Sequence, residues 1–162
     1  MDSKIIIYIL IVALLAVTIT GSACAFEIMG HSGGADTERG ISIEEIEFNI
    51  PDGYEKINDK SIVNMTNSSG NISYVVNQET YKNSDGEEII ISIVDYNDFD
   101  VDADTLYRIC EGTEAKTMMG YPGYINKMEN YTQFVYAFNH KAVGITAPNE
   151  KVINQILVVE DS

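Results

Sequence analysis

The sequence predicts an α+β domain, in which an antiparallel β-sheet of two hairpins plus an N-terminal strand carries two helices on one face. Three observations predict this class. Segments of alternating apolar and polar residues flank short turns, two other segments space their apolar residues at three and four, and strands do not alternate strictly with helices. An N-terminal apolar helix is predicted to precede the domain.

The N-terminal segment predicts export. Lys4 precedes the uncharged run Ile5–Phe26, and Ala23-Cys24-Ala25 supplies the small residues of a cleavage site after Ala25. The run is also long enough for a retained membrane helix, since about 20 apolar residues cross a bilayer. Residues 1–25 are therefore predicted to be a signal peptide or a membrane anchor. Both alternatives leave Lys4 in the cytoplasm and the remainder outside, secreted or tethered to the outer face of the cytoplasmic membrane.

Two further features belong to the region before the domain. Gly21-Ser22-Ala23-Cys24 resembles the end of a bacterial lipoprotein signal, which makes lipid attachment to Cys24 a third alternative. The Gly-rich run Gly30–Gly40 has no apolar periodicity, so residues 26–40 are predicted to be a flexible spacer. Residues 41–162 then form one extracytoplasmic domain.

The first half of the domain is predicted to be strands. Ile46, Phe48 and Ile50 alternate with polar residues, which predicts one strand over 41–50 that ends at Pro51-Asp52-Gly53. The polar stretch 64–71 is predicted to be a loop. Alternation over 72–81 and an apolar run over 89–96 predict a hairpin that turns at 83–86.

The second half contains both predicted helices. Leu106, Ile109 and Cys110 have helical spacing, which predicts a helix over about 103–116. A bend at Tyr121-Pro122-Gly123, a short strand over 124–128 and a hairpin of 131–139 with 142–146 follow. Pro148 begins an amphipathic C-terminal helix.

Two segments carry a family resemblance. Phe48–Tyr54 is a strand that ends in a Pro-containing turn, and a hairpin, a helix and a closing meander follow it, as in small exported domains of the Mog1/PsbP-like type. Phe134–Val158, a hairpin that leads into a terminal helix, is similar to small uncharacterised exported proteins of methanogenic archaea. The resemblance implies a fold and a compartment, and it implies no catalytic residue.

The charge balance excludes one class of partner. The formal net charge is −15, and Lys and Arg do not cluster anywhere in the chain. Nucleic acids are bound through clustered basic residues, so no nucleic-acid partner is expected. The predicted partners are an unknown protein or small-molecule ligand outside the cell, and the membrane if the N-terminal helix is uncleaved.

Acidic residues suggest one candidate metal site. Oxygen ligands at alternate positions are typical of calcium loops, and four aspartates alternate here, although no Gly stands where an EF-hand requires it. A weak Ca²⁺ site is one hypothesis, and capping of the following helix is the other. No other cofactor is predicted. The four residues are Asp98, Asp100, Asp102 and Asp104.

Tyrosines and asparagines suggest two further kinds of site. Four tyrosines surround the predicted bend and the second hairpin, and they suggest a ligand-binding groove as well as ordinary packing: Tyr121, Tyr124, Tyr131 and Tyr136. Four asparagines fit the Asn-X-Ser/Thr acceptor of N-glycosylation: Asn64, Asn67, Asn71 and Asn130.

No catalytic motif accompanies these residues. Cys110 and His140 could form a nucleophilic pair, but neither lies in a signature that surrounds such pairs. The sequence therefore predicts a binding or envelope-associated domain that is not an enzyme. The alternatives are a divalent-cation-dependent adhesion or scaffold module that uses Asp98–Asp104, and an enzyme that uses Cys110 and His140.

Overall fold

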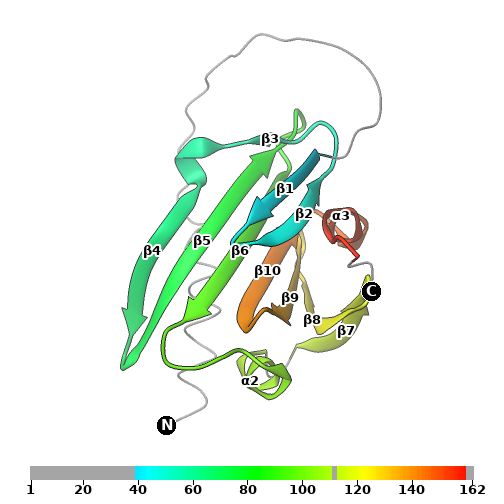
Figure 1. The fold of residues 1–162 in the computed structure, drawn as a ribbon. Coiled ribbons are helices and arrows are strands. Elements are labelled where there is room, and N and C mark those ends of the chain that lie inside the picture. Colours follow the sequence, from blue (N-terminus) through cyan, green and yellow to red (C-terminus); the bar gives the residue numbers. More distant parts are fainter. Residues whose placement is uncertain (1–38, 111–112, 160–162) are drawn as a thin grey trace.

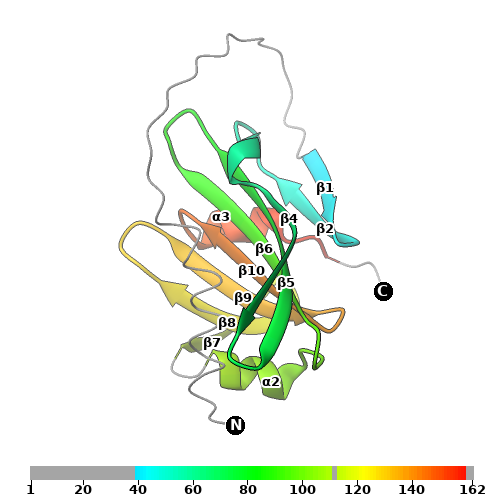
Figure 2. The same cartoon turned by 90° about the vertical axis from the view of Figure 1, so that its left-hand side faces the viewer.

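The computed structural model describes residues 39–110 and 113–159. Its main element is an eight-stranded antiparallel sheet in the order β3-β5-β6-β10-β9-β8-β7, with β4 also paired to β5 (Figure 1). A separate two-stranded sheet, β1–β2, crosses one side of it, and Figure 2 shows this arrangement from a second direction. The elements are β1 (Arg39–Ile43), β2 (Ile46–Ile50), β3 (Glu55–Lys56), the 3₁₀ helix η1 (Asn58–Lys60), β4 (Ile62–Ser69), β5 (Ile72–Lys82), β6 (Glu88–Tyr96), α2 (Ala103–Ile109), β7 (Glu114–Met118), β8 (Tyr121–Lys127), β9 (Thr132–Phe138), β10 (Lys141–Ala147) and α3 (Glu150–Ile156).

The coarse prediction of an α+β fold with an antiparallel sheet is confirmed. β5 pairs with β6 and β9 pairs with β10, as the two predicted hairpins require. The β9–β10 turn consists of Asn139 and His140, with φ angles of 48° and 62°. Two successive positive φ angles are the geometry of a type I′ turn, which matches the twist of the strands on either side.

β6 lies inside the sheet and is buried on both of its faces. Side chains alternate across a strand, so Ile89, Ile91 and Ile93 point to one face, while Val94 and Tyr96 point to the other. All five side chains are buried. The domain therefore has two hydrophobic cores, one on each face of the same sheet.

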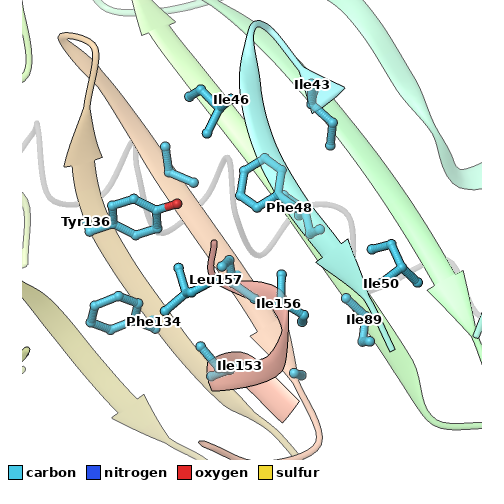
Figure 3. Packing of buried hydrophobic residues seen from close by; sticks show 14 of the residues in the cluster. Ile43, Ile46, Phe48, Ile50, Ile89, Phe134, Tyr136, Ile153, Ile156 and Leu157 are labelled. Atoms are coloured by element: carbon cyan, nitrogen blue, oxygen red, sulfur yellow. The ribbon is translucent and has the colours of Figure 1, made fainter. Parts of the chain in front are cut away.

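The larger core lies between the sheet and a cover made of β1–β2 and α3. Figure 3 shows Phe48 and Ile50 from β2 in one cluster with Ile153 and Ile156 from α3. Phe48 also forms an isolated antiparallel bridge with Leu157, directly after α3. Asn149 caps α3, because its Oδ1 accepts a hydrogen bond of 3.1 Å from the N–H of Val152.

α2 packs against the opposite face. Leu106 and Ile109 belong to the second core, together with Val76, Val94 and Val135 of the sheet. The prediction that both helices lie on one face is therefore wrong. The physical reason is that β6 carries apolar side chains on both faces of the sheet, so each face needs elements that cover it.

Several predicted boundaries are also wrong. Residues 41–50 form most of a hairpin in place of one strand, because Glu44 and Glu45 adopt φ angles of 51° and 64° and reverse the chain. Residues 39 and 40 belong to β1, so the predicted spacer of 26–40 overlaps the domain. The predicted polar loop 64–71 is mostly β4, which pairs with β5.

The region around α2 also differs from the prediction. The helix ends at Ile109, and residues 114–118, predicted as helix in part, form β7. The predicted bend at 121–123 lies inside β8, and the chain turns earlier, at Met119 and Gly120. Pairing with β8 outweighs the helical periodicity that predicts a helix up to residue 116.

A polar network fixes the β1–β2 hairpin to the sheet. Glu44 accepts hydrogen bonds of 2.9 Å from both Asn77 Nδ2 and Lys141 Nζ, and Lys141 lies 3.6 Å from Asp95. Asn77 also accepts a 2.7 Å bond from the N–H of Asn64. A positive φ costs a non-glycine residue on the order of 1 kcal/mol, and these contacts offset that cost at Glu44.

Gly123 provides a test of the packing between β8 and β9. A Cβ at this position would overlap the carbonyl oxygen of Val135 and lie 2.8 Å from two ring carbons of Phe134. We predict that Gly123→Ala lowers the free energy of unfolding by about 1–3 kcal/mol, as overpacking does elsewhere. Chemical denaturation measures this change.

Gly40→Ala is the matched control, because a Cβ at Gly40 meets no atom within 4 Å. It should leave the stability nearly unchanged. If the Gly123→Ala protein is as stable as the Gly40→Ala protein, Phe134 of β9 does not pack closely against Gly123 of β8.

Candidate binding cleft and the predicted sites

The N-terminus of α2 is fixed by a capping aspartate. Asp102 Oδ1 accepts a 2.8 Å hydrogen bond from the N–H of Thr105, and Asp104 lies in the first turn, where a negative charge favours the helix dipole. The hydrogen bonds to Thr105 lower the pKa of the Asp102 carboxyl. α2 is only two turns long, so it covers part of the sheet face beneath it.

A cleft of about 440 Å³ lies between α2 and strands β7–β9. Its side chains are mostly apolar and small: Ala103, Leu106, Ala115, Lys116, Thr117, Pro122, Gly123, Tyr124 and Ala137. Lys116 directs its charge elsewhere, because its Nζ forms an ion pair with Glu150 of α3. The cleft therefore offers an apolar surface with few hydrogen-bonding groups.

Two tyrosines stand next to each other beside this cleft. The rings of Tyr107 and Tyr124 lie 6.4 Å apart between centroids and are tilted by 51°. Tyr107 is 59% exposed, so one large aromatic side chain of α2 is left open to solvent. Partial burial raises the pKa of Tyr124, whose hydroxyl is a neutral hydrogen-bonding group at pH 7.

The four predicted tyrosines do not line one groove. Tyr124 lines the cleft, whereas Tyr136 is buried in the core on the opposite face, where its ring lies 4.8 Å from that of Tyr121. Tyr121 donates a 2.6 Å hydrogen bond to the carbonyl oxygen of Val158. Tyr131 lies in the β8–β9 turn, where its carbonyl oxygen accepts a bond of 2.9 Å from the N–H of Met128.

The four aspartates are spread over the loop before α2 and its first turn. Asp102 acts as the helix cap, and Asp100 lies 3.7 Å from His140 Nδ1, with both side chains more than three-quarters exposed. Within residues 39–110 and 113–159, no three His, Cys, Asp or Glu side chains are arranged to hold a metal ion. Calcium binding by the four aspartates, Asp98, Asp100, Asp102 and Asp104, stays a prediction.

Cys110 and His140 occupy different environments. Cys110 is buried in the second core, which α2 covers, and this burial raises the pKa of its thiol to about 12. His140 is exposed in the β9–β10 turn, where its Nδ1 lies 3.7 Å from a carboxylate oxygen of Asp100. No hydrogen bond joins the two side chains in the described part of the protein, and a neutral, buried thiol is a poor nucleophile.

The four acceptor asparagines are all exposed. Asn64 and Asn67 lie on β4, Asn71 lies in the β4–β5 turn, and Asn130 lies in the β8–β9 turn. Asn67 Oδ1 accepts a 2.8 Å bond from the N–H of Ser68. Exposure is required for modification but does not identify it, so glycosylation stays a prediction.

Most residues of the cleft cannot be recognised from the sequence. Leu106, Ala115 and Ala137 are small or aliphatic residues that carry no chemical signal in a sequence. Tyr107 carries one, because about 3.6 residues per turn rotate it about 100° from Leu106 and about 160° from Ile109, away from the buried side of the helix. An aromatic residue in that position is a usable indication of a binding surface.

Comparison of the chain with models of protein families, with curated proteins and with solved structures returns no match. The Mog1/PsbP-like resemblance therefore stays a prediction. Residues 1–25, the predicted signal or anchor with Cys24, lie outside the described residues. Among the helices that are described, none is long and apolar enough to cross a membrane.

The environment of Cys110 predicts slow alkylation of the folded protein. In a Cys24→Ser chain, where Cys110 is the remaining cysteine, iodoacetamide at neutral pH should react at least about 100-fold more slowly than after denaturation in urea. Mass spectrometry follows the reaction. Rapid labelling of the folded chain at neutral pH contradicts a buried, protonated thiol.

The same burial predicts a loss of stability in alkali. Burial makes the folded state favour the neutral Cys110 thiol. The contribution of this thiol to the free energy of unfolding is fully present below its ordinary pKa of 9.0 and is lost as the pH rises toward about 12. Cys110→Ala removes the thiol. Its stability should fall less than that of the parent chain over this pH range.

Proposed function

We propose that this protein is a non-enzymatic extracytoplasmic binding domain, and that the cleft between α2 and β7–β9 receives an apolar or aromatic group of its ligand. The observation that carries the proposal is the cleft itself, a mostly apolar volume of about 440 Å³ beside an exposed aromatic side chain. Concave apolar surfaces with a few polar groups are the usual form of ligand sites.

The tyrosine pair supports an aromatic or other planar group as the ligand's anchor. Tyr107 and Tyr124 present ring faces and edges at a tilt, and aromatic contacts of this kind contribute about 0.5–1.5 kcal/mol beyond the burial of area. The net charge of −15 disfavours polyanionic ligands. The favoured ligand is therefore neutral or cationic and has an apolar ring.

The location of the domain is part of the proposal. It is supported by Lys4 and the uncharged run Ile5–Phe26, which are typical of a signal peptide or a retained anchor. The exposed asparagines of β4 support glycosylation outside the membrane. The intact mass of the protein from membrane and culture-medium fractions tests both points, and an unmodified, full-length cytoplasmic protein would exclude them.

The binding proposal predicts a specific loss on mutation. A set of small aromatic probes, namely phenol, indole and benzamide, is screened against the full chain by saturation-transfer NMR. We expect at least one probe to bind, and Tyr124→Ala to weaken its affinity about tenfold, equivalent to about 1.4 kcal/mol.

Tyr131→Ala is the matched control, because Tyr131 lies in a turn and does not line the cleft. It should bind the probe as the parent chain does, and a melting curve shows that each variant is folded. Equal binding by the parent chain, Tyr124→Ala and Tyr131→Ala, or no binding of any probe, contradicts the proposal.

A further inference from the structure

The large sheet ends in two edges that differ in how they are closed. β3 and β4 lie along one side, and β7 lies along the other. An edge strand has N–H and C=O groups that no neighbouring strand pairs, and such groups can pair with another chain. Proteins commonly prevent this pairing with bulges, with local side-chain hydrogen bonds or by keeping the strand short.

The β4 edge is closed by its own residues. The register with β5 shifts between Ile62 and Met65, which marks a bulge. The N–H of Asn64 donates to Asn77 Oδ1 at 2.7 Å, and the N–H of Ser68 donates to Asn67 Oδ1 at 2.8 Å. The bulge and the occupied N–H of Ser68 therefore interrupt β4 as an edge for a second strand.

β7 has no such protection. Its five residues pair with β8 in a regular register, and Met118 and Tyr121 form the closing pair of a two-residue turn. The closing pair of such a turn is hydrogen-bonded, and bonded pairs alternate with non-bonded pairs. Thr117 and Pro122 are therefore a non-bonded pair, in agreement with the absence of an N–H on proline.

This alternation fixes the direction of the backbone groups of β7. The N–H and C=O groups of Ala115 and Thr117 point away from β8, and both residues are exposed. Within the described residues, no strand other than β8 pairs with β7. The edge therefore offers two residues with outward hydrogen-bonding groups.

The charges on β7 indicate which strand fits this edge. Glu114 and Lys116 project toward the face of the sheet that α3 covers. Ala115, between them, projects toward the opposite face, which bears the cleft. Suppose two copies of β7 pair antiparallel with Ala115 opposite Ala115 of the second copy. Each Glu114 then lies opposite Lys116 of the other copy, and opposite charges in cross-strand pairs are favourable.

The other registers that use the outward groups are less favourable. Placing Ala115 opposite Thr117 of the second copy brings the two Lys116 side chains together, and like charges directly opposite each other are destabilising. Placing Thr117 opposite Thr117 leaves Lys116 opposite Met118, so no opposite-charge pair forms between the two copies. The charge pattern therefore selects one register, with its two-fold axis at Ala115.

We propose that two copies of this domain associate through antiparallel pairing of β7, with Ala115 on the two-fold axis and two Glu114–Lys116 pairs across it. A five-residue pairing is small, so the dimer is weak and reversible. Ala115 and Thr117 also line the cleft, so pairing brings the clefts of the two copies side by side on one face. The inference does not depend on what the cleft binds.

Cysteine crosslinking of the full chain tests the pairing directly. Residues opposite each other in a hydrogen-bonded pair have Cα atoms about 5.5 Å apart, which is within the range of a disulfide. In a Cys24→Ser background, Ala115→Cys should form a disulfide-linked dimer under mild oxidation at least tenfold faster than Thr117→Cys. Thr117→Cys is the matched control, since it lies on the same strand and face but away from the axis.

Equal crosslinking of the two variants, preferential crosslinking of Thr117→Cys, or no dimer from Ala115→Cys above the parent level would each overturn the proposal. Melting curves identify any variant that fails to fold. A charge test adds a second readout in the Ala115→Cys chain. Glu114→Lys or Lys116→Glu alone should reduce the rate of crosslinking at least fivefold.

An equal mixture of these two charge variants should restore crosslinking between unlike chains. The first variant then carries two lysines and the second two glutamates, so each faces its opposite across the axis. Failure of the mixture to restore crosslinking overturns the assigned register even if single variants are impaired. The Lys116→Glu chain also loses its pair with Glu150, so Lys127→Glu, which disturbs Glu150 from another strand, controls for that loss.

Discussion

The structure depends on the burial of β6 on both faces. Ile89, Ile91 and Ile93 contribute to one core and Val94 and Tyr96 to the other, so neither face of the central strand can be left to water. Burying one such side chain contributes about 1.5–3 kcal/mol, and these residues form the middle of both cores. This constraint places β1–β2 and α3 on one side of the sheet and α2 on the other.

The two covers differ in extent, and the difference creates the candidate site. The hairpin and α3 together cover the first face with interlocking side chains around Phe48. α2 has only seven residues and leaves part of the β7–β9 surface uncovered. The cleft and the exposed ring of Tyr107 are consequences of that incomplete cover. The same region contains the unprotected edge of the sheet, so the candidate ligand site and the candidate pairing surface adjoin at Ala115.

The sequence predicted the features that local patterns determine and missed those that pairing determines. Strand-like segments on either side of short polar turns predicted the β5–β6 and β9–β10 hairpins. Apolar spacing after Pro148 predicted α3, although the helix begins two residues later than predicted, at Glu150, with Asn149 as its cap. β4 was missed because its Asn- and Ser-rich sequence has little strand propensity of its own, and pairing with β5 stabilises it. The apolar run of β6 contained evidence for two covered faces, because it does not alternate. Tyr121 and Tyr124 differ in parity, so once β8 is known to be a strand they must lie on opposite faces.

Native-state hydrogen exchange of the full chain tests the central role of β6 most directly. β6 is paired on both sides and buried on both faces, so its amides should exchange only through global unfolding, together with those of β5 and β10. Amides of α2 and β7 should exchange faster, through local opening that leaves the central strands intact. Exchange of β6 amides as fast as that of α2 and β7 amides would contradict the account, because the sheet could then not be organised around that strand.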